Sequence, residues 1–170
     1  MIRKATLEDL KEIEKIYYIA VKHMVDEGNG NQWTDYKSFE IGVIKYINSG
    51  SFYVYYKNKE LVGMFALIYG IDNTYNVIRN GKWINNEPYA TIHKIATKYY
   101  RQHIASDILE YIIKDVKSKN IHNIRIDTHE KNVSMRKFLE YYNFIYCGII
   151  SITCNYEEVE SLRFAYIKSI

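Results

Sequence analysis

Apolar side chains recur along this chain at two spacings, which separate the expected helices from the expected strands. Between Leu10 and Met24 they fall on one face of a helix, and Thr6 with the acidic residues Glu8 and Asp9 shortly after it is typical of a helix N-terminus. The same periodicity predicts three further helices, over residues 39–47, 105–116 and 132–142.

Runs of β-branched and aromatic residues lie between these helices and predict strands. Residues 52–56 and 61–68 are two such runs, and the polar residues 57–60 between them predict a β-hairpin. The other predicted strands cover residues 2–5, 89–97, 124–127, 144–152 and 162–167. The order β-α-α-β-β-β-α-β-α-β-β, without a linker or an internal repeat, predicts one α/β domain over residues 1–170.

Two segments depart from this regular pattern. Residues 69–87 have no clear period and are long for a connection in a compact domain, which predicts a functional loop. The chain has 8 glycines but none between Gly81 and Gly148, so that stretch holds neither a Walker-type nor a Rossmann phosphate loop.

Composition and charge narrow the classes of function. Apolar residues make up 48 % and charged residues 25 %, as in a folded globular protein, and a net charge of +3 is too small for a nucleic-acid footprint. Cys147 and Cys154 form no CxxC motif and have no histidine pair nearby, which argues against a disulfide framework and a zinc site. With no signal-peptide pattern and no membrane-length apolar run, the sequence predicts a cytoplasmic protein with free thiols, no metal, and neither nucleic-acid nor membrane partners.

Residues 92–106 combine an extended strand, a short polar loop and a helix N-terminus. Unsatisfied backbone N–H groups at such a helix end, together with the helix dipole, suit a pyrophosphate. Any β-loop-α unit offers the same feature, so a purely structural role stays open on this evidence alone.

Several segments resemble the GNAT superfamily of N-acyltransferases. Residues 89–97 and 100–109 resemble its acyl-CoA-binding motif. The remaining matches are residues 124–129, Asn132, Met135 and 144–150 in the C-terminal half, and 2–6, 32–33, 61–63 and 81–83 in the N-terminal half. The resemblance implies a GNAT-type fold with a mixed central sheet of six to seven strands flanked by helices, and acetyl-CoA as cosubstrate.

The resemblance also assigns cofactor contacts. It implies that backbone groups of Ile95, Ala96 and Thr97 pair with the pantetheine arm and that Asn132 lies near the cofactor. The residues implied at the pyrophosphate are Arg101, Gln102, His103, Ile104, Ala105 and Ser106. Two family features are missing: the glycine of the phosphate loop, and a tyrosine on the following helix that protonates the CoA thiolate, at whose place this chain has Leu139.

Proton transfer must therefore come from other side chains. Strand alternation predicts that His93, Ile95 and Thr97 share one face, and that Arg125, Asp127 and His129 share another. His93 and His129 are the candidates for the catalytic base, because imidazole titrates in the right range, with a structural histidine as the alternative for each. Tyr142 and Tyr146 are weaker candidates for the proton donor, since a packing role is the commoner use of such tyrosines.

The acceptor pocket is expected around Trp33, Trp83 and residues 69–87, with Asp127 orienting a neighbour or binding the substrate amine. The carboxylates considered for a cationic amine are Glu27, Asp35 and Glu87. The alternative is that residues 69–87 simply pack on the sheet as an ordinary lid.

The sequence thus predicts an N-acetyltransferase that moves an acetyl group from acetyl-CoA to a primary amine by direct attack in a ternary complex. The alternatives are a non-catalytic acyl-CoA-binding or regulatory protein with a GNAT fold, and an unrelated α/β nucleotide-binding domain. The acceptor, a small-molecule or peptide amine, is left open, and the resemblance makes a homodimer a further expectation.

Overall fold

The computed structural model describes residues 1–152 and 161–170, and Cys154 lies outside these residues. Contacts between residues divide the chain into two compact units. The first comprises Met1–Ile68 and His93–Asp115, and the second comprises Tyr69–Ile92 and Val116–Ile170. A single domain over residues 1–170 therefore stays a prediction.

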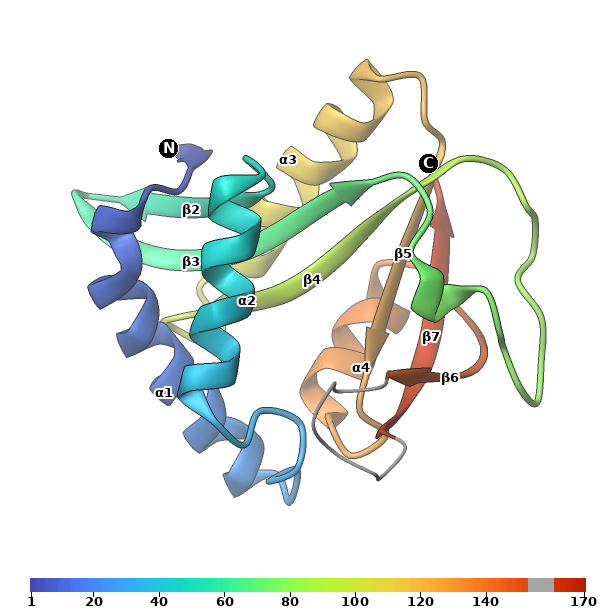
Figure 1. Ribbon diagram of the computed structural model, residues 1–170, viewed down its shortest axis with the longest axis horizontal. Coiled ribbons are helices and arrows are strands. Elements are labelled where there is room, and N and C mark those ends of the chain that lie inside the picture. Colours follow the sequence, from blue (N-terminus) through green and yellow to red (C-terminus); the bar gives the residue numbers. More distant parts are fainter. Residues whose placement is uncertain (153–160) are drawn as a thin grey trace. The chain divides into compact units, whose positions relative to one another are not determined.

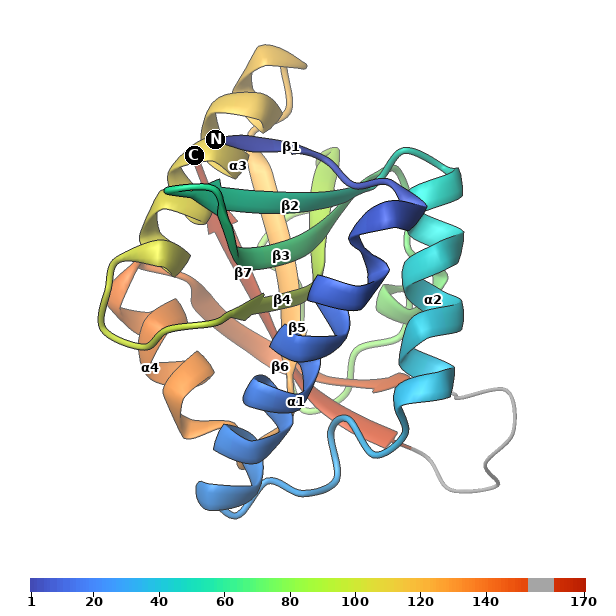
Figure 2. The same ribbon diagram turned by 90° about the vertical axis from the view of Figure 1, so that its left-hand side faces the viewer.

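The first unit packs helices on both faces of an antiparallel hairpin. Its elements are β1 (Ile2–Lys4), the 3-10 helix η1 (Leu7–Asp9), α1 (Leu10–Asp26), α2 (Tyr36–Asn48), β2 (Phe52–Lys57), β3 (Glu60–Tyr69), the end of β4 (Tyr89–Thr97) and most of α3 (Ile104–Ser118). β1 pairs with β2 and β2 with β3, both antiparallel, which confirms the predicted hairpin. Figures 1 and 2 show α1 and α2 over one face of this hairpin and α3 over the other.

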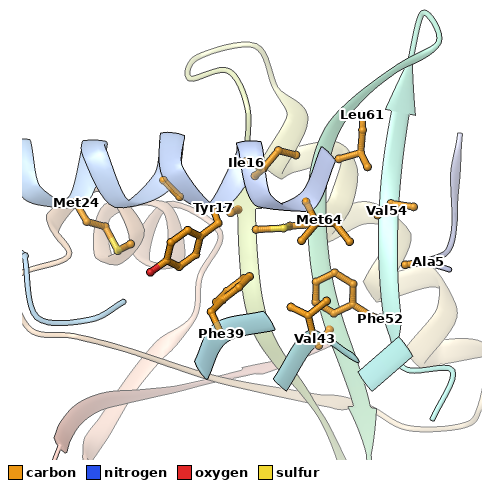
Figure 3. Close-up of a cluster of buried hydrophobic side chains, with 14 residues drawn as sticks. Ala5, Ile16, Tyr17, Met24, Phe39, Val43, Phe52, Val54, Leu61 and Met64 are labelled. Atoms are coloured by element: carbon orange, nitrogen blue, oxygen red, sulfur yellow. The ribbon is translucent and has the colours of Figure 1, made fainter. Parts of the chain in front are cut away.

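Alternation along the strands explains these two layers. Val54 and Met64 belong to a buried cluster that also takes in Ile16 and Tyr17 of α1 and Phe39 of α2 (Figure 3). Their neighbours in sequence face α3 instead. Gly63 provides the closest approach, because a Cβ there would lie 2.8 Å from Ile108 Cδ1 of α3. A glycine at this position therefore lets α3 seat directly on β3.

The second unit is built on β4, β5 (Asn123–Thr128), β7 (Ser161–Ser169) and β6 (Ile145–Ile152). Tyr89–Ile92 of β4 run parallel to β5, whereas β7 is antiparallel to both β5 and β6. The seven strands follow the order β1-β2-β3-β4-β5-β7-β6, so the predicted mixed sheet of six to seven strands and the predicted order of elements are confirmed.

Each face of the second unit's strands is covered by a different segment. On one face α4 (Val133–Tyr141) places Arg136 against the Phe164 ring of β7, with 5.0 Å from the guanidinium carbon to the ring centroid. On the other face the 3-10 helix η2 (Asn73–Tyr75) buries Tyr75 with Ile150 and Ala165. Among the described helices, none is long and apolar enough to span a membrane.

Candidate active site

Strand β4 changes its pairing in the middle. Tyr89 to Ile92 form a parallel ladder with Asn123 to Ile126 of β5, and the ladder ends there although β4 continues to Thr97. At its far end the amide of Lys98 donates to the carbonyl of Val62 on β3 at 2.8 Å. The segment His93–Thr97 belongs to the first unit and carries three of the predicted cofactor residues, Ile95, Ala96 and Thr97.

The prediction of strict alternation along β4 is wrong at His93. Lys94 has a φ of 51°, a left-handed conformation inside a strand, and it acts as a local bulge. Both His93 and Lys94 consequently reach α2: the His93 ring stacks on Tyr46 at 6.4 Å between centroids, and Lys94 Nζ lies 4.2 Å from the Phe39 ring centroid. His93 therefore shares a face with its sequence neighbour, because a bulge shifts the side-chain period by one.

Residues 98–103 form the loop between β4 and α3, and this loop contains no glycine. Arg101 and His103 nevertheless both have a φ of 60°, on either side of Gln102. Left-handed residues within a turn direct successive backbone N–H groups to one side, which makes a small anion-binding concavity. The carbonyl of His103 then accepts from the amide of Asp107 at 2.9 Å, which starts α3.

The structure thus brings the implied cofactor residues of the first unit together as one stretch, from β4 through the loop to the first turn of α3. The side chains of Arg101, Gln102 and His103 are exposed. Ile104 is 2 % exposed, and a Cβ on Gly63 would lie 3.1 Å from its Cγ2. Only the backbone of Ile104 can therefore serve a ligand, since its side chain anchors the helix in the core.

In the second unit, Asn132 lies at the start of α4. Its Oδ1 accepts from the amide of Met135 at 3.1 Å, so the buried side chain caps the helix. A cap of this kind typically stabilises a helix by about 1 kcal/mol. This structural role accounts for the Oδ1 of Asn132, while the predicted cofactor contact stays a prediction.

His129 follows β5 and is half-buried. Its Nδ1 accepts a hydrogen bond of 3.2 Å from the backbone N–H of Lys131. Burial, followed by the charge of Arg163, lowers the pKa of His129. A neutral ring whose Nδ1 is an acceptor carries its proton on Nε2. The side chain is thereby set up as a donor at Nε2.

Asp127 and Arg125 both face the segment over residues 70–88, in agreement with the predicted alternation on β5. Tyr75 donates from its hydroxyl to Asp127 Oδ1 at 2.7 Å, and burial, then the Asp127 charge, raises the pKa of Tyr75 well above its ordinary value. The Arg125 guanidinium lies between two rings, 4.0 Å from the Trp83 centroid and 3.9 Å from the Tyr89 centroid. Asp127 therefore already holds a protein partner at the position where an acceptor amine was expected.

The sequence of the chain matches a known family. The model of the Acetyltransferase (GNAT) family matches residues 7–144. This chain belongs to the GNAT acetyltransferase family. No curated protein matched the sequence in the corresponding comparison.

Solved structures of other GNAT acetyltransferases share the fold. A GNAT-family acetyltransferase from Streptococcus agalactiae is 27 % identical with a TM-score of 0.85, and the match covers 100 % of this chain and 95 % of that one. The PaiA N-acetyltransferase from Thermoplasma acidophilum, in complex with coenzyme A, is 19 % identical with a TM-score of 0.69, covering 100 % and 98 %. The ribosomal-protein-alanine N-acetyltransferase from Brucella melitensis is 17 % identical with a TM-score of 0.64, covering 100 % and 99 %.

The two tryptophans of this GNAT acetyltransferase belong to different units. Trp33 stacks on Tyr17 at 5.8 Å between centroids and packs against the core of the first unit. Trp83 donates from Nε1 to the carbonyl of Tyr75 at 2.9 Å and packs in the second. The contacts of Trp83 support the alternative that residues 69–87 pack on the sheet. The substrate contacts predicted for Trp33 and Trp83 stay predictions.

The weaker donor candidates also pack as side chains of the GNAT fold. Tyr146 meets Phe164 edge-on at 5.1 Å, and Tyr142 contacts the Phe138 ring at 4.8 Å. Leu139 is 1 % exposed. Among the described residues, no group of three His, Cys, Asp or Glu side chains is placed to hold a metal ion.

Sequence reasoning missed Arg125 and Tyr75 as organisers of the 70–88 segment. Arg125 is 4 % exposed, and its Nη2 donates to the carbonyl of Asn85 at 2.9 Å. The available signal was an arginine in the middle of a strand expected to be buried. That signal indicates an unusual position but does not predict its partner, Asn85, which lies 40 residues away along the chain.

Proposed function

We propose that this protein transfers the acetyl group of acetyl-CoA to a primary amine by direct attack in a ternary complex. The supporting observation is the continuous stretch in which β4 outruns its ladder with β5 and leads through a loop with left-handed residues into α3. A strand edge suits the amides of an extended pantetheine arm, and turn amides before a helix N-terminus suit a diphosphate.

The bonds that form and break define what the protein must supply. The amine nitrogen attacks the thioester carbonyl carbon, an N–C bond forms, and the C–S bond breaks. The attacking amine has to lose a proton, and the departing thiolate has to gain one. One acceptor and one donor of protons are therefore required near the thioester.

We assign His93 as the candidate base and His129 as the candidate donor. His129 suits donation because its Nδ1 is already engaged by the Lys131 amide, which leaves the proton on Nε2. The sequence made both histidines candidates for the base, whereas this assignment gives one the role of base and the other the role of proton donor. It also offers a substitute for the tyrosine whose place is taken by the buried Leu139.

A calorimetric titration with acetyl-CoA tests the cofactor, and release of free thiol across a panel of amines tests turnover. The panel holds a polyamine, an aminoglycoside, free amino acids, a lysine peptide and a peptide with N-terminal alanine. The last is included because a structure of the same fold is named a ribosomal-protein-alanine N-acetyltransferase. Binding with thiol release supports the enzyme, binding without release on any amine supports the non-catalytic alternative, and no binding at about millimolar ligand overturns both.

Two variants test the assigned roles. We expect His93→Ala to lower kcat about a hundredfold or more, the usual scale for loss of a general base. His129→Asn keeps an acceptor for the Lys131 amide and removes the Nε2 donor, so kcat falls while the fold is kept. Full kcat in both variants across about pH 6 to 9 contradicts the assignment.

A further inference from the structure

The loop over residues 98–103 holds a conformation that its own residues disfavour. Arg101 and His103 both adopt a left-handed φ of 60°. For residues other than glycine this costs about 1 kcal/mol or more at each position. Such a conformation persists only when contacts with neighbouring elements impose it.

The first of these contacts is made by Glu60, the first residue of β3. Its Oε1 accepts hydrogen bonds from Lys98 Nζ and from the Tyr99 hydroxyl, the latter at 2.8 Å. The hydrogen bond from Lys98, followed by the one from Tyr99, lowers the pKa of Glu60, so the carboxylate is ionised at neutral pH. One carboxylate oxygen thus binds two consecutive residues of the loop to β3.

The second contact is made by His23, in the last turn of α1. Its ring lies against the Tyr100 ring with 3.9 Å between centroids, and its Nε2 is 3.5 Å from Oε1 of Glu27, the residue that caps the C-terminus of α1. Burial, followed by the Glu27 charge, raises the pKa of Tyr100 to about 12, so the phenol stays neutral against the imidazole. The third consecutive loop residue is therefore held by α1.

The far end of the left-handed turn is fixed as well. Ile104 is buried at 2 % exposure, and the carbonyl of His103 receives the first hydrogen bond of α3. Only Arg101 to His103 lie between the two fixed ends. The anchors upstream therefore determine which way the backbone N–H groups of this short turn point.

We propose that Glu60 and His23 are positioning residues, which hold the glycine-free loop in the conformation that binds the diphosphate of CoA. This inference rests on the proposed use of CoA. External anchoring of the loop then does what glycine does in related loops: it keeps a left-handed backbone available for the approach of a phosphate. Glu60 contacts Lys98 and Tyr99, and His23 contacts Tyr100, so both residues act through the loop.

The test compares two ligands that differ in the diphosphate. Calorimetry measures the dissociation constants of both ligands for the wild type, Glu60→Ala and His23→Ala. The ligands are CoA and pantetheine, which lacks the nucleotide and its phosphates. We expect the dissociation constant for CoA to rise about tenfold in each alanine variant, and the dissociation constant for pantetheine to stay within about twofold of the wild-type value. An unchanged affinity for CoA, or an equal loss for both ligands, overturns the inference.

Matched variants separate positioning from general damage. His23→Phe keeps a ring against Tyr100 and is expected to bind CoA nearly as the wild type does. Glu60→Gln keeps an acceptor oxygen but loses the charge, so its CoA affinity should fall between those of the wild type and Glu60→Ala. Asp26→Ala breaks the exposed ion pair with Lys22 on α1, away from the loop. We expect it to leave the affinities for CoA and for pantetheine unchanged.

A measurement without ligand covers the case in which a variant is less stable overall. Amide hydrogen exchange over residues 98–106 should be faster in both alanine variants, while the core of α1 keeps its protection. Unchanged exchange in the loop overturns the inference. If the wild type does not bind CoA, both the proposed function and this inference are overturned. If the alanine variants bind CoA normally, only the anchoring role of Glu60 and His23 is overturned.

Discussion

Arg125 is a cation whose partners in the described part of the chain carry no formal negative charge. The two ring faces of Trp83 and Tyr89 and the carbonyl of Asn85 hold its guanidinium, and its buried Nε has no hydrogen-bond partner within residues 1–152 and 161–170. Burial is the main reason that the pKa of Arg125 is lowered. The cost of desolvating the charge is thus offset by the two ring contacts and by the dipole of the Asn85 carbonyl. The volume of the side chain therefore contributes more to stability than its charge does.

We expect Arg125→Ala to lower the free energy of unfolding by about 3 kcal/mol, because it leaves a cavity between two rings and removes the bond to the Asn85 carbonyl. Arg125→Met keeps most of the volume and avoids burying a charge, so its loss should stay below about 1 kcal/mol. Urea unfolding of both variants measures the difference. Equal losses would mean that the charge, and not the volume, stabilises this site.

His129 links stability to pH. Its pKa in the folded protein lies below the ordinary value of 6.5, mainly because of burial and also because of Arg163. Below about pH 6.5 the unfolded chain therefore binds a proton that the folded protein resists, so stability falls as the pH is lowered through this range.

His129→Asn, which keeps an acceptor for the Lys131 amide, should reduce this acid sensitivity. Urea unfolding at about pH 7.5 and about pH 5.5 measures the change in unfolding free energy for the wild type and the variant. The control is His122→Asn, at an exposed position. In this variant the change in unfolding free energy between the two pH values should equal that of the wild type. A wild-type acid sensitivity that survives in His129→Asn is incompatible with this account.

At the scale of elements, the segment over residues 70–88 is bound to β6 by backbone. Arg79 and Ile149 exchange two hydrogen bonds of 2.8 Å, and a Cβ added at Gly81 would lie 2.0 Å from the carbonyl oxygen of Cys147. Gly148 has a φ of 142° where it passes Arg79. The two glycines at the ends of the long glycine-free stretch thus allow one close contact between backbones.

We expect Gly81→Ala to cost about 2 kcal/mol of unfolding free energy, because the new methyl group meets backbone that cannot rotate away. Hydrogen exchange of the Arg79 and Ile149 amides should become faster at the same time. The matched control is Gly30→Ala, where the nearest atom to a Cβ is 3.9 Å away, and its effect should stay within about 0.5 kcal/mol. Intact protection of both amides in Gly81→Ala would contradict the assigned contact.

At the scale of the whole molecule, the two units are interleaved in the sequence. The first takes residues from both sides of Tyr69–Ile92, and the second takes that segment and the C-terminal part. Strand β4 and helix α3 each pass from one unit to the other. Neither unit is one continuous piece of chain, so unfolding of either one disrupts elements that the other needs.

The interleaving predicts one cooperative transition. Trp33 reports on the first unit and Trp83 on the second, so Trp83→Phe and Trp33→Phe leave one fluorescent probe in each. Within each variant, urea unfolding followed by tryptophan fluorescence and by far-ultraviolet circular dichroism should have the same midpoint. A fluorescence midpoint that departs from the dichroism midpoint in either variant would mean that the units unfold separately.

The sequence predicted the elements well because their signals are local. Hydrophobic periodicity places α1 and α3, and the polar turn at residues 57–60 places the hairpin, each within a few residues of its observed bounds. The site was predicted only in part. The stretch from Ile95 to Ser106 is continuous in sequence and was found through the resemblance, whereas the partners of its residues lie far away along the chain.

By itself, then, the sequence determined the order of helices and strands, the chemistry available on each and the family to which the chain belongs, because these depend on neighbouring residues. Only the tertiary structure decided the bulge at Lys94, the left-handed turn at Arg101 and His103, and the proton position on His129. Contacts such as Glu60 with Lys98 and Tyr75 with Asp127 join residues 38 and 52 positions apart. Backbone conformations that the residues themselves disfavour exist only where such distant contacts impose them, so no local pattern can reveal them.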